Sequence, residues 1–250
     1  MKVLVVGEHC RDEFVYGSCE RLCPEGPVPV IKPHDLLIND GMAGNVAANV
    51  RGLLHPCHHL RQDNDIIKTR YMDERSNHLL LRVDQNDYAD HIKHPLIKYD
   101  DYELIIISDY DKGFLTEEDI GVIATNAKSK GIPVMLDTKK PLHKDWLHDM
   151  TFIKINEVEY ERTKFTLDDL EDRLIVTLGK EGCMYQGIRY DAPKKIDTID
   201  ISGAGDTFMA AFAIRYVETK DVIESINFAQ KCTSVVVQLK GVSVVSINDL

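Results

Sequence analysis

Residues 196–213 read IDTIDISGAGDTFMAAFA and place two glycines, Gly203 and Gly205, directly before Asp206. A strand-like segment that ends near Ile201 leads into this glycine turn, and a helical pattern follows it. The helix is expected to bury three aromatic side chains spaced four residues apart. These are Phe208, Phe212 and Tyr216. The stretch therefore predicts a strand, a tight turn and a buried helix in succession.

A glycine turn at the start of a helix exposes backbone N–H groups that have no acceptor within the helix, and such groups bind anions, phosphate above all. A carboxylate in the same turn binds phosphate poorly. It can, however, accept the proton of an attacking hydroxyl during phosphoryl transfer. Asp206 is therefore a candidate general base. The residues alone also allow a second interpretation, in which Asp206 only caps the helix.

Composition and charge restrict the class of protein. A chain of 250 residues with 44% hydrophobic and 28% charged residues is long enough for one sizeable α/β domain. Its 30 basic and 41 acidic side chains give a net charge of -11, which opposes binding to nucleic acid or to an anionic membrane surface. No stretch resembles a signal peptide or approaches the roughly 20 apolar residues of a membrane span. A cytoplasmic protein is expected.

The six cysteines have no paired spacing, so reduced thiols are expected rather than disulfides. The densest group of soft metal ligands is HPCHHL at residues 55–60, which Cys19 and Cys23 could join in a zinc site. Neither group has the spacing of a zinc finger. We therefore interpret HPCHHL as a solvated turn rich in histidine, with zinc as the alternative.

Short apolar runs rich in β-branched residues alternate with helical patterns along the chain. The runs are 2–6, 104–108, 133–137, 151–155 and 173–178. The clearest helix is 116–131, where Thr116 can act as N-cap and Gly131 ends the pattern. Continuous apolar strands separated by helices predict a parallel sheet covered on both faces, with ligands bound at the carboxyl ends of its strands.

Two segments, 14–33 and 69–84, do not fit this alternation of apolar strands and helices. Both contain alternating apolar residues, and the first contains several prolines. Alternation is typical of exposed strands rather than of buried parallel ones. We expect these segments to form a small sheet outside the main one.

The motif DTIDISGAGDTFMAAFA resembles the C-terminal signature of the ribokinase or PfkB family of carbohydrate kinases. Further matches follow in the order of the family: SDYDKG at 108–113, VMLDTKK at 134–140, INEVEYE at 155–161 and VTLGKEG at 176–182. The resemblance implies a ribokinase-like α/β fold, with three α/β/α layers and a mainly parallel central sheet. It also implies an ATP-dependent kinase that uses Mg²⁺. The whole chain, 1–250, is expected to form one kinase domain with a small β-strand lid from about 14–38 and 69–84.

Within this family, VLVVGEHCRDEFVYGSCERLCPEGPVPVIK at 3–32 and GMAGNVAANV at 41–50 resemble the kinases that phosphorylate heptose 7-phosphate at its anomeric hydroxyl. This resemblance implies a homodimer that pairs through the lid strands. The segment Gly52–Thr69 is shorter than the α/β unit that the family has there, so the chain is a shortened form. No nucleotidyltransferase domain follows Leu250, so the second activity of the bifunctional heptose enzymes is not expected.

The resemblance also implies roles for individual residues. Asp206 matches the catalytic base, and Gly203, Ala204 and Gly205 match the anion hole for the transferred phosphate. On the sugar side the implied residues are Asp12, Gly41, Asn45, Arg70, Arg82 and Lys112. On the nucleotide side they are Asn156, Thr177, Gly179, Gly203, Gly205 and Gln230, the last standing where the family has an asparagine. Mg²⁺ is expected to bind through water at Asn156 and Glu159, because a hard cation prefers oxygen ligands.

Cationic side chains add a further expectation. Arg21, Arg70 and Arg82 lie in or beside the lid segments, where guanidinium groups could hold a remote phosphate of the sugar. Lys112 and Lys139 are candidates near the phosphates, with surface lysines as the alternative reading.

Met42 departs from the family pattern, because a second glycine would let the backbone approach a ligand there. Met42 and the shortened segment keep two alternatives open. One is a non-catalytic sugar- or nucleotide-binding regulatory protein on the same fold, and the other is a kinase of another sugar or of a nucleoside. The missing Gly-x4-Gly-Lys-Ser/Thr motif excludes a Walker-type ATPase, and the missing Gly-x-Gly-x-x-Gly after the first strand excludes a dinucleotide fold.

Overall fold

The computed structural model describes residues 1–93, 97–163, 170–193 and 198–250. Its centre is an eight-stranded sheet with the strand order β12-β11-β10-β9-β8-β7-β1-β4. All pairs from β10 to β4 are parallel, whereas β11 and β12 pair antiparallel at one edge. The strands span Val3–Gly7 (β1), Cys57–Leu60 (β4), Leu104–Asp109 (β7), Val134–Thr138 (β8), Phe152–Asn156 (β9), Leu174–Thr177 (β10), Cys183–Tyr185 (β11) and Ile188–Tyr190 (β12).

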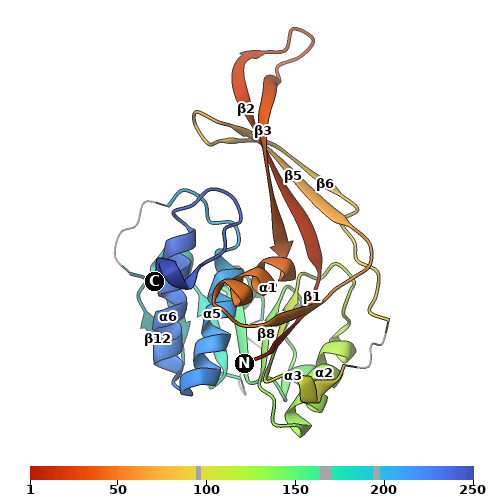
Figure 1. Ribbon diagram of the computed structural model, residues 1–250, viewed down its shortest axis with the longest axis vertical. Helices are drawn as coiled ribbons and strands as arrows, with labels where there is room; N and C mark the ends of the chain where they lie inside the picture. Colours follow the sequence, from red (N-terminus) through yellow and green to blue (C-terminus); the bar gives the residue numbers. More distant parts are fainter. Residues whose placement is uncertain (94–96, 164–169, 194–197) are drawn as a thin grey trace.

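Helices cover both faces of this sheet and complete three layers (Figure 1). Alternate residues of β1 and β7 face opposite layers: Val3 and Leu104 pack with α1, α5 and α6, whereas Leu4 and Ile105 pack with α2 and α3. The helices span Ala43–Gly52 (α1), Glu117–Ser129 (α2), Lys144–Leu147 (α3), Glu157–Thr163 (α4), Ala204–Thr219 (α5) and Val222–Val236 (α6). Because both faces of each strand are buried, the strands read as continuous apolar runs.

The boundaries of α2 follow from its end residues. The Thr116 hydroxyl accepts a hydrogen bond from the N–H of Asp119 at 3.1 Å, and the Asp119 carboxylate accepts the N–H of Thr116 at 2.8 Å. This reciprocal pair is a capping box, which stabilises the first turn. At the other end Gly131 has a φ of 71°, the left-handed conformation that favours glycine after a helix. The predicted start and end of this helix are confirmed.

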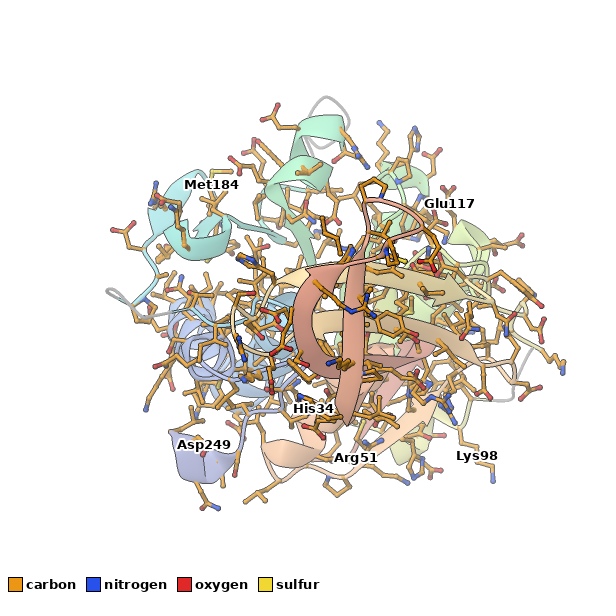
Figure 2. All side chains as sticks on the ribbon, turned by 90° about the horizontal axis from the view of Figure 1, so that it is seen from above. His34, Arg51, Lys98, Glu117, Met184 and Asp249 are labelled. Carbon is orange, nitrogen blue, oxygen red and sulfur yellow. The ribbon has the colours of Figure 1, made fainter. Side chains whose placement is uncertain are left out.

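A second, four-stranded sheet, here called the lid, projects above the central sheet (Figure 1) and lies over the middle of the molecule when seen from above (Figure 2). Its strands are His9–Leu22 (β2), Pro29–Met42 (β3), Ile66–Asp73 (β5) and Leu79–Gln85 (β6). A parallel β2–β5 pair joins two antiparallel hairpins. The expected small sheet is confirmed, but its strands extend beyond 14–38 and 69–84 to begin at His9 and to end at Gln85.

The HPCHHL segment is not a solvated turn, and that interpretation is wrong. Cys57–Leu60 forms β4, the edge strand of the central sheet, and pairs parallel with β1 from Val3 to Val6. Two imidazoles find partners, because His58 Nδ1 lies 2.9 Å from Tyr102 Oη and His59 Nε2 lies 3.1 Å from Gly7 O. Local polarity concealed a strand whose pairing partner lies about 50 residues away along the chain.

The strand expected to end near Ile201 is also wrong for the part of the segment that the structure describes. Residues 198–201 have no strand conformation, and 194–197 lie outside the described residues. The Ile199 N–H instead donates to Val237 O at 2.8 Å, which ties this segment to the end of α6. The predicted helix is confirmed, since Phe208 and Phe212 are buried in α5 and Tyr216 packs partly buried against the same cluster.

None of the helices among the described residues combines the length and the apolar content needed to cross a membrane.

Candidate active site

Asp206 lies in the first turn of α5, beneath the lid, and only 4% of its surface is exposed. Both of its carboxylate oxygens accept hydrogen bonds from other elements. The Tyr110 hydroxyl, in the loop after β7, donates to Oδ1 at 2.6 Å, and Asn45 Nδ2, from α1, donates to Oδ2 at 3.1 Å. The carboxylate is therefore oriented by two donors from distant parts of the chain.

The environment of Asp206 changes its proton affinity. Burial raises the pKa of Asp206 to about 6, although the hydrogen bonds from Tyr110 and Asn45 and the charge of Lys154 oppose the rise. The neighbouring Asp137 adds to it. A carboxylate with a pKa near 6 is ionised at neutral pH and still takes up a proton far more readily than an ordinary aspartate. That is the proton affinity expected of a general base.

The glycine turn before Asp206 has a geometry that only glycine allows. Gly203 is the N-cap of α5 with a φ of 78°, and a Cβ placed on it would lie 2.4 Å from Asn45 Nδ2. The Ala204 N–H donates to Ile201 O at 3.2 Å, but the N–H of Gly205 has no acceptor among the residues that the structure describes. The first turn of α5 thus presents a backbone donor to an anion beside Asp206.

A cavity of about 370 Å³ opens beside Asp206, between the lid and the carboxyl ends of the central strands. It brings together six of the residues that the sequence implied from separate elements. These are Asp12, Arg70, Arg82, Lys112, Gly203 and Asp206. Met42, Tyr110 and Lys139 also line it. Arg21, in contrast, lies near the far end of β2, opposite Val30, and is not part of the lining.

On the lid side of this cavity, the Asp12 carboxylate forms an ion pair with Arg70. Gly41 lies opposite, and a Cβ placed on it would lie 2.0 Å from Asp12 Oδ2, so any larger residue would displace that carboxylate. Next to it Met42 has a φ of 56° and a ψ of -137°, a conformation that costs a residue other than glycine about 1–3 kcal/mol. The backbone at Gly41 and Met42 thus has a shape that two glycines would adopt without strain.

Other cations of the cavity are paired with carboxylates. Arg82 donates to Asp84 at 2.7 and 2.8 Å, and Lys112 Nζ lies 2.6 Å from Asp87. Lys68 also contacts Asp87, at 2.8 Å. An anionic ligand would therefore exchange these contacts for its own rather than meet free cations.

Asn156 and Glu159 form a capping box at the start of α4. The Asn156 side-chain oxygen accepts the N–H of Glu159 at 2.9 Å, and the Glu159 carboxylate accepts the N–H of Asn156 at 2.8 Å. The second carboxylate oxygen of Glu159 accepts from Lys139 Nζ at 2.6 Å. Their oxygens suit a hard cation. No group of three or more His, Cys, Asp or Glu side chains placed to hold a metal directly is found within the described ranges.

The remaining residues implied for the nucleotide lie further along the same sheet edge. Thr177 ends β10 and pairs with Asn156, and Gly179 follows it in a short 3-10 helix, Gly179–Glu181 (η3). Gln230, in α6, is buried and its amide donates to Tyr190 O at 2.8 Å. These residues do not line the cavity beside Asp206.

Sequence reasoning missed three side chains that contact or support the surroundings of Asp206. Tyr110 was quoted within SDYDKG without a role, and the structure shows that it contacts Asp206. Glu8 accepts the N–H groups of Tyr110 and Lys112 at 2.8 and 2.9 Å, which fixes the loop that carries Tyr110. Lys154, on β9, pairs with Asp137 and lies 3.5 Å from Gly205 O. Its position in a buried strand was the signal available, because an unpaired lysine is almost never buried.

Comparisons with known proteins agree with this geometry. Residues 105–248 match the model described as pfkB family carbohydrate kinase. Among solved structures, ribokinase from Arabidopsis thaliana, complexed with ribose and ATP, superposes with a TM-score of 0.70 at 18% identity, covering 99% of this chain and 95% of that one. A putative ribokinase from Agrobacterium tumefaciens gives a TM-score of 0.73 at 18% identity, covering 96% and 92%. The ribokinase-like three-layer fold is confirmed.

Among curated sequences, the bifunctional protein HldE of a Nitratiruptor species is 27% identical over 304 aligned positions, which include 100% of this chain and 64% of the relative. HldE of Campylobacter jejuni (strain RM1221) is 25% identical over 293 positions, again with 100% and 64% coverage. The chain thus spans about 64% of the length of these relatives. The alignments are longer than the 250 residues of this chain, so the relatives contain segments that it lacks.

Proposed function

Because the chain belongs to the pfkB family of carbohydrate kinases, we propose that it transfers the γ-phosphate of ATP to a hydroxyl of a sugar or sugar phosphate, with Asp206 as general base. The observation that carries this proposal is the position of Asp206. Its carboxylate has a pKa near 6, is oriented by Tyr110 and Asn45, and lies next to the N–H of Gly205. Base and anion site thus share one helix turn, as transfer to an alcohol requires.

Each group of the site has a separate role in the proposed phosphoryl transfer. A sugar hydroxyl beside Asp206 gives its proton to the carboxylate while its oxygen bonds to the γ-phosphorus, and the bond from that phosphorus to the β-phosphate oxygen breaks to leave ADP. The N–H of Gly205 at the start of α5 stabilises negative charge on the transferred group. Lys139, which lines the cavity, adds a positive charge on the same side. Tyr110 keeps the carboxylate aimed at the hydroxyl.

We place Mg²⁺ near Asn156 and Glu159, whose oxygens would hold its water ligands. When bound, the ion neutralises part of the charge on the ATP phosphates. The chain contributes two carboxylate oxygens of Glu159, which now accept from Asn156 N and Lys139 Nζ. Lys139 can turn from Glu159 to a phosphate, since 36% of its side chain is exposed.

Glu159→Gln is expected to raise the Mg²⁺ concentration needed for half-maximal activity by about tenfold, because a neutral amide attracts a hydrated cation less than a carboxylate does. The measurement is a Mg²⁺ titration of the rate at fixed ATP. Glu157→Gln serves as the control, since Glu157 lies exposed in the same first turn of α4. An unchanged titration in Glu159→Gln would remove the metal role from this residue.

For the acceptor we propose a heptose 7-phosphate, phosphorylated at its anomeric hydroxyl. The whole chain aligns with HldE sequences, and the cavity has both a hydroxyl-binding carboxylate and several cations. Asp12 suits sugar hydroxyls, and Arg70, Arg82 and Lys112 on the lid side suit a phosphate remote from the reacting carbon. The thioether side chain of Met42 also lines the cavity and occupies space on the same side.

ADP release in a coupled assay tests both the proposed kinase activity and the proposed heptose phosphate acceptor. Heptose 7-phosphate is expected to give at least about tenfold higher kcat/KM than free hexoses, because loss of one charged contact costs about 1.4 kcal/mol or more. ATP hydrolysis without sugar is expected to be slow, because the lid closes and completes the catalytic site only when the sugar is bound. Equal rates with free hexoses would reject the heptose phosphate while leaving a sugar kinase, and no ADP release with any sugar would reject the kinase.

We further propose a homodimer that forms through the outer face of the lid. On this face the four strands are in register, so that two rows of paired side chains run from β3 to β6. The residues at both ends of each row are apolar and largely exposed. Leu36 and Ile38 of β3 are 52% and 50% exposed, and Leu81 and Val83 of β6 are 56% and 36% exposed. Val15 and Tyr71 lie between Leu36 and Leu81, and Glu13 and Thr69 lie between Ile38 and Val83. Exposed apolar side chains at both edges of a small sheet usually pack against a partner. A second copy presents the same apolar face, so the two faces can cover each other.

Light scattering after gel filtration at micromolar concentration is expected to give twice the monomer mass of 28.4 kDa. Ile38→Asp is expected to shift the protein to the monomer, because the new carboxylate replaces an apolar contact, lies opposite the carboxylate of Glu13 and loses its water in the interface. Val122→Asp is the matched control: Val122 is 53% exposed on α2, away from the lid. A monomeric wild-type protein would reject the dimer.

A further inference from the structure

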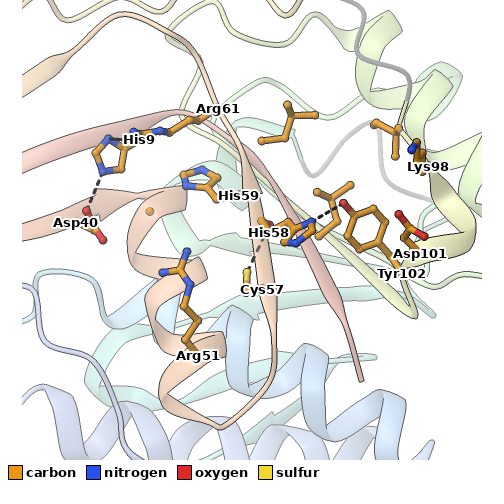
Figure 3. Close-up of a pocket in the computed structure, with 14 residues that line it drawn as sticks. His9, Asp40, Arg51, Cys57, His58, His59, Arg61, Lys98, Asp101 and Tyr102 are labelled. Carbon is orange, nitrogen blue, oxygen red and sulfur yellow. Dashed lines mark hydrogen bonds and ion pairs between the residues drawn. The ribbon is translucent and has the colours of Figure 1, made fainter.

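A second cavity, of about 750 Å³, lies around the edge strand β4, outside the site described above (Figure 3). From β4 the chain passes directly into the lid, with 61–65 as the only connection to β5. The edge of the central sheet is therefore left open at β4. Side chains from β2, β3, α1, β4 and the segment around η1 (Tyr99–Asp101) surround the opening.

The charges around this cavity are unusual for a chain with a net charge of -11. Three cations, Arg51, Arg61 and Lys98, face two carboxylates, Asp40 and Asp101. Within the described ranges, neither the Arg51 guanidinium nor the Lys98 ammonium has a carboxylate within ion-pair distance. The wall thus carries positive charge that no carboxylate neutralises at close range.

Arg51 also acts on its neighbours in the cavity wall. Burial raises the pKa of Cys57 to about 11 and lowers the pKa of His59 to about 4. The positive charge of Arg51 lowers both values, by a smaller effect in each case. His59 is therefore neutral at physiological pH. The positive charge available to a ligand in the middle of the cavity wall is that of Arg51.

Arg61 is connected to the sugar side of the active site through His9. Arg61 Nη1 lies 2.7 Å from His9 Nδ1, and a guanidinium can only donate, so Nδ1 accepts and the proton of the neutral imidazole is on Nε2. That Nε2–H donates to Asp40 at 2.9 Å. Figure 3 shows this chain of contacts at one end of the cavity. His9 also packs closely on α1, because a Cβ on Gly44 would lie 2.4 Å from its ring.

The other end of the cavity is suited to the organic part of a ligand. The Tyr102 ring lies there, in edge contact with His58 at a centroid distance of 5.6 Å, and Leu60 and Ile97 add apolar surface. Figure 3 shows Tyr102 and Lys98 at this end, away from Arg61 and His9. A ligand that spans both ends needs an anionic group and a flat or apolar body.

We propose that this cavity binds a small organic phosphate as a second, non-substrate ligand, with its phosphate between Arg51 and Arg61 and its body against Tyr102. Two guanidinium groups supply the forked donors that phosphate oxygens accept best. Such a phosphate draws Arg61 away from His9. His9 and Asp40 directly precede Cys10 and Gly41, which pair across the lid beside Asp12, so the ligand changes how Asp12 is held and hence the affinity for sugar.

Isothermal titration calorimetry with AMP and with pyrophosphate, each up to about 10 mM, tests the site without any assay of activity. AMP is expected to bind more tightly than pyrophosphate, because only AMP reaches Tyr102. Arg51→Gln is expected to weaken binding by about tenfold or more, and since Arg51 is exposed without an ion pair the variant should fold normally. The control is Arg189→Gln, an exposed arginine on the opposite edge strand β12.

Hydrogen exchange then locates the ligand. AMP is expected to slow exchange in β4 and at 9–12 in wild-type protein, and much less in Arg51→Gln. Failure of both probes to bind wild-type protein would overturn the proposal. Binding that Arg51→Gln leaves unchanged, or protection confined to the first turn of α5, would also overturn it, because the ligand would then occupy the site beside Asp206.

Discussion

Asp206→Asn is expected to lower kcat by about 10²- to 10⁴-fold while leaving ATP affinity nearly unchanged. The amide keeps the size of the carboxylate and its oxygen can still accept from Tyr110, while its NH2 group meets Asn45, whose amide must turn over to present its oxygen. It cannot take up the proton of the sugar hydroxyl. ADP release and a separate measurement of nucleotide binding together distinguish loss of the base from loss of the site.

Asp221→Asn is the matched control for this experiment. Asp221 caps α6 by accepting the N–H of Glu224 at 2.9 Å, so it is an aspartate at a helix start whose side chain serves there as a cap. Asparagine caps helices about as well as aspartate. If Asp206 also served only as a cap, both variants would keep full activity, and the general base would have to be sought elsewhere.

The pH dependence follows from the same carboxylate. Because the pKa of Asp206 is raised to about 6, kcat/KM at saturating ATP is expected to fall about tenfold per pH unit below 6 and to level off above it. The free energy of unfolding depends on pH in the opposite direction to kcat/KM. A carboxyl whose pKa is raised on folding stabilises the fold below its unfolded pKa, and this contribution is lost as the pH rises through 6. Asp206→Asn should therefore unfold no more easily than wild type at pH 8.

The sheet and helices could be predicted because their signals are local. Runs such as 104–107 are apolar throughout and have no alternative to a buried strand, and Thr116 and Gly131 mark the two ends of α2 from the residues beside it. The strand β4 escaped prediction, since His58 and His59 become strand residues only through pairing with β1. Propensity describes the segment itself, whereas an edge strand depends on its neighbour.

The site was predictable as a set of residues but not as a set of contacts. Asn45 was implied to hold sugar hydroxyls, and the structure shows its amide on Asp206, which lies 161 residues away along the chain. Tyr110 had no local signal at all, because a phenol acquires a role only from the group that it meets. Asn156 and Glu159 could have been recognised as a capping box from their spacing of three residues. A metal role and a capping role have the same sequence pattern.

Gly203→Ala is expected to lower kcat by about 10²-fold or more, because it disturbs the anion site and the base together. The new Cβ would lie 2.4 Å from Asn45 Nδ2, so it must displace the amide that donates to Asp206 or shift the turn that presents the N–H of Gly205. Either movement changes the position of a charge relative to the reacting phosphate. The variant also carries a side chain at a φ of 78°, which lowers the free energy of unfolding by about 1–2 kcal/mol.

Gly187→Ala separates these two effects, because Gly187 has a φ of 71° but a Cβ placed on it would meet no atom within 4 Å. Both variants should lose free energy of unfolding, measured by denaturant titration, since both bear the backbone strain, and Gly203→Ala should lose more because its methyl group also meets Asn45. Only Gly203→Ala should lose activity, since only its methyl group meets the amide that orients the base. Equal activity in the two variants would mean that the contact between Asn45 and Asp206 is not needed for phosphoryl transfer.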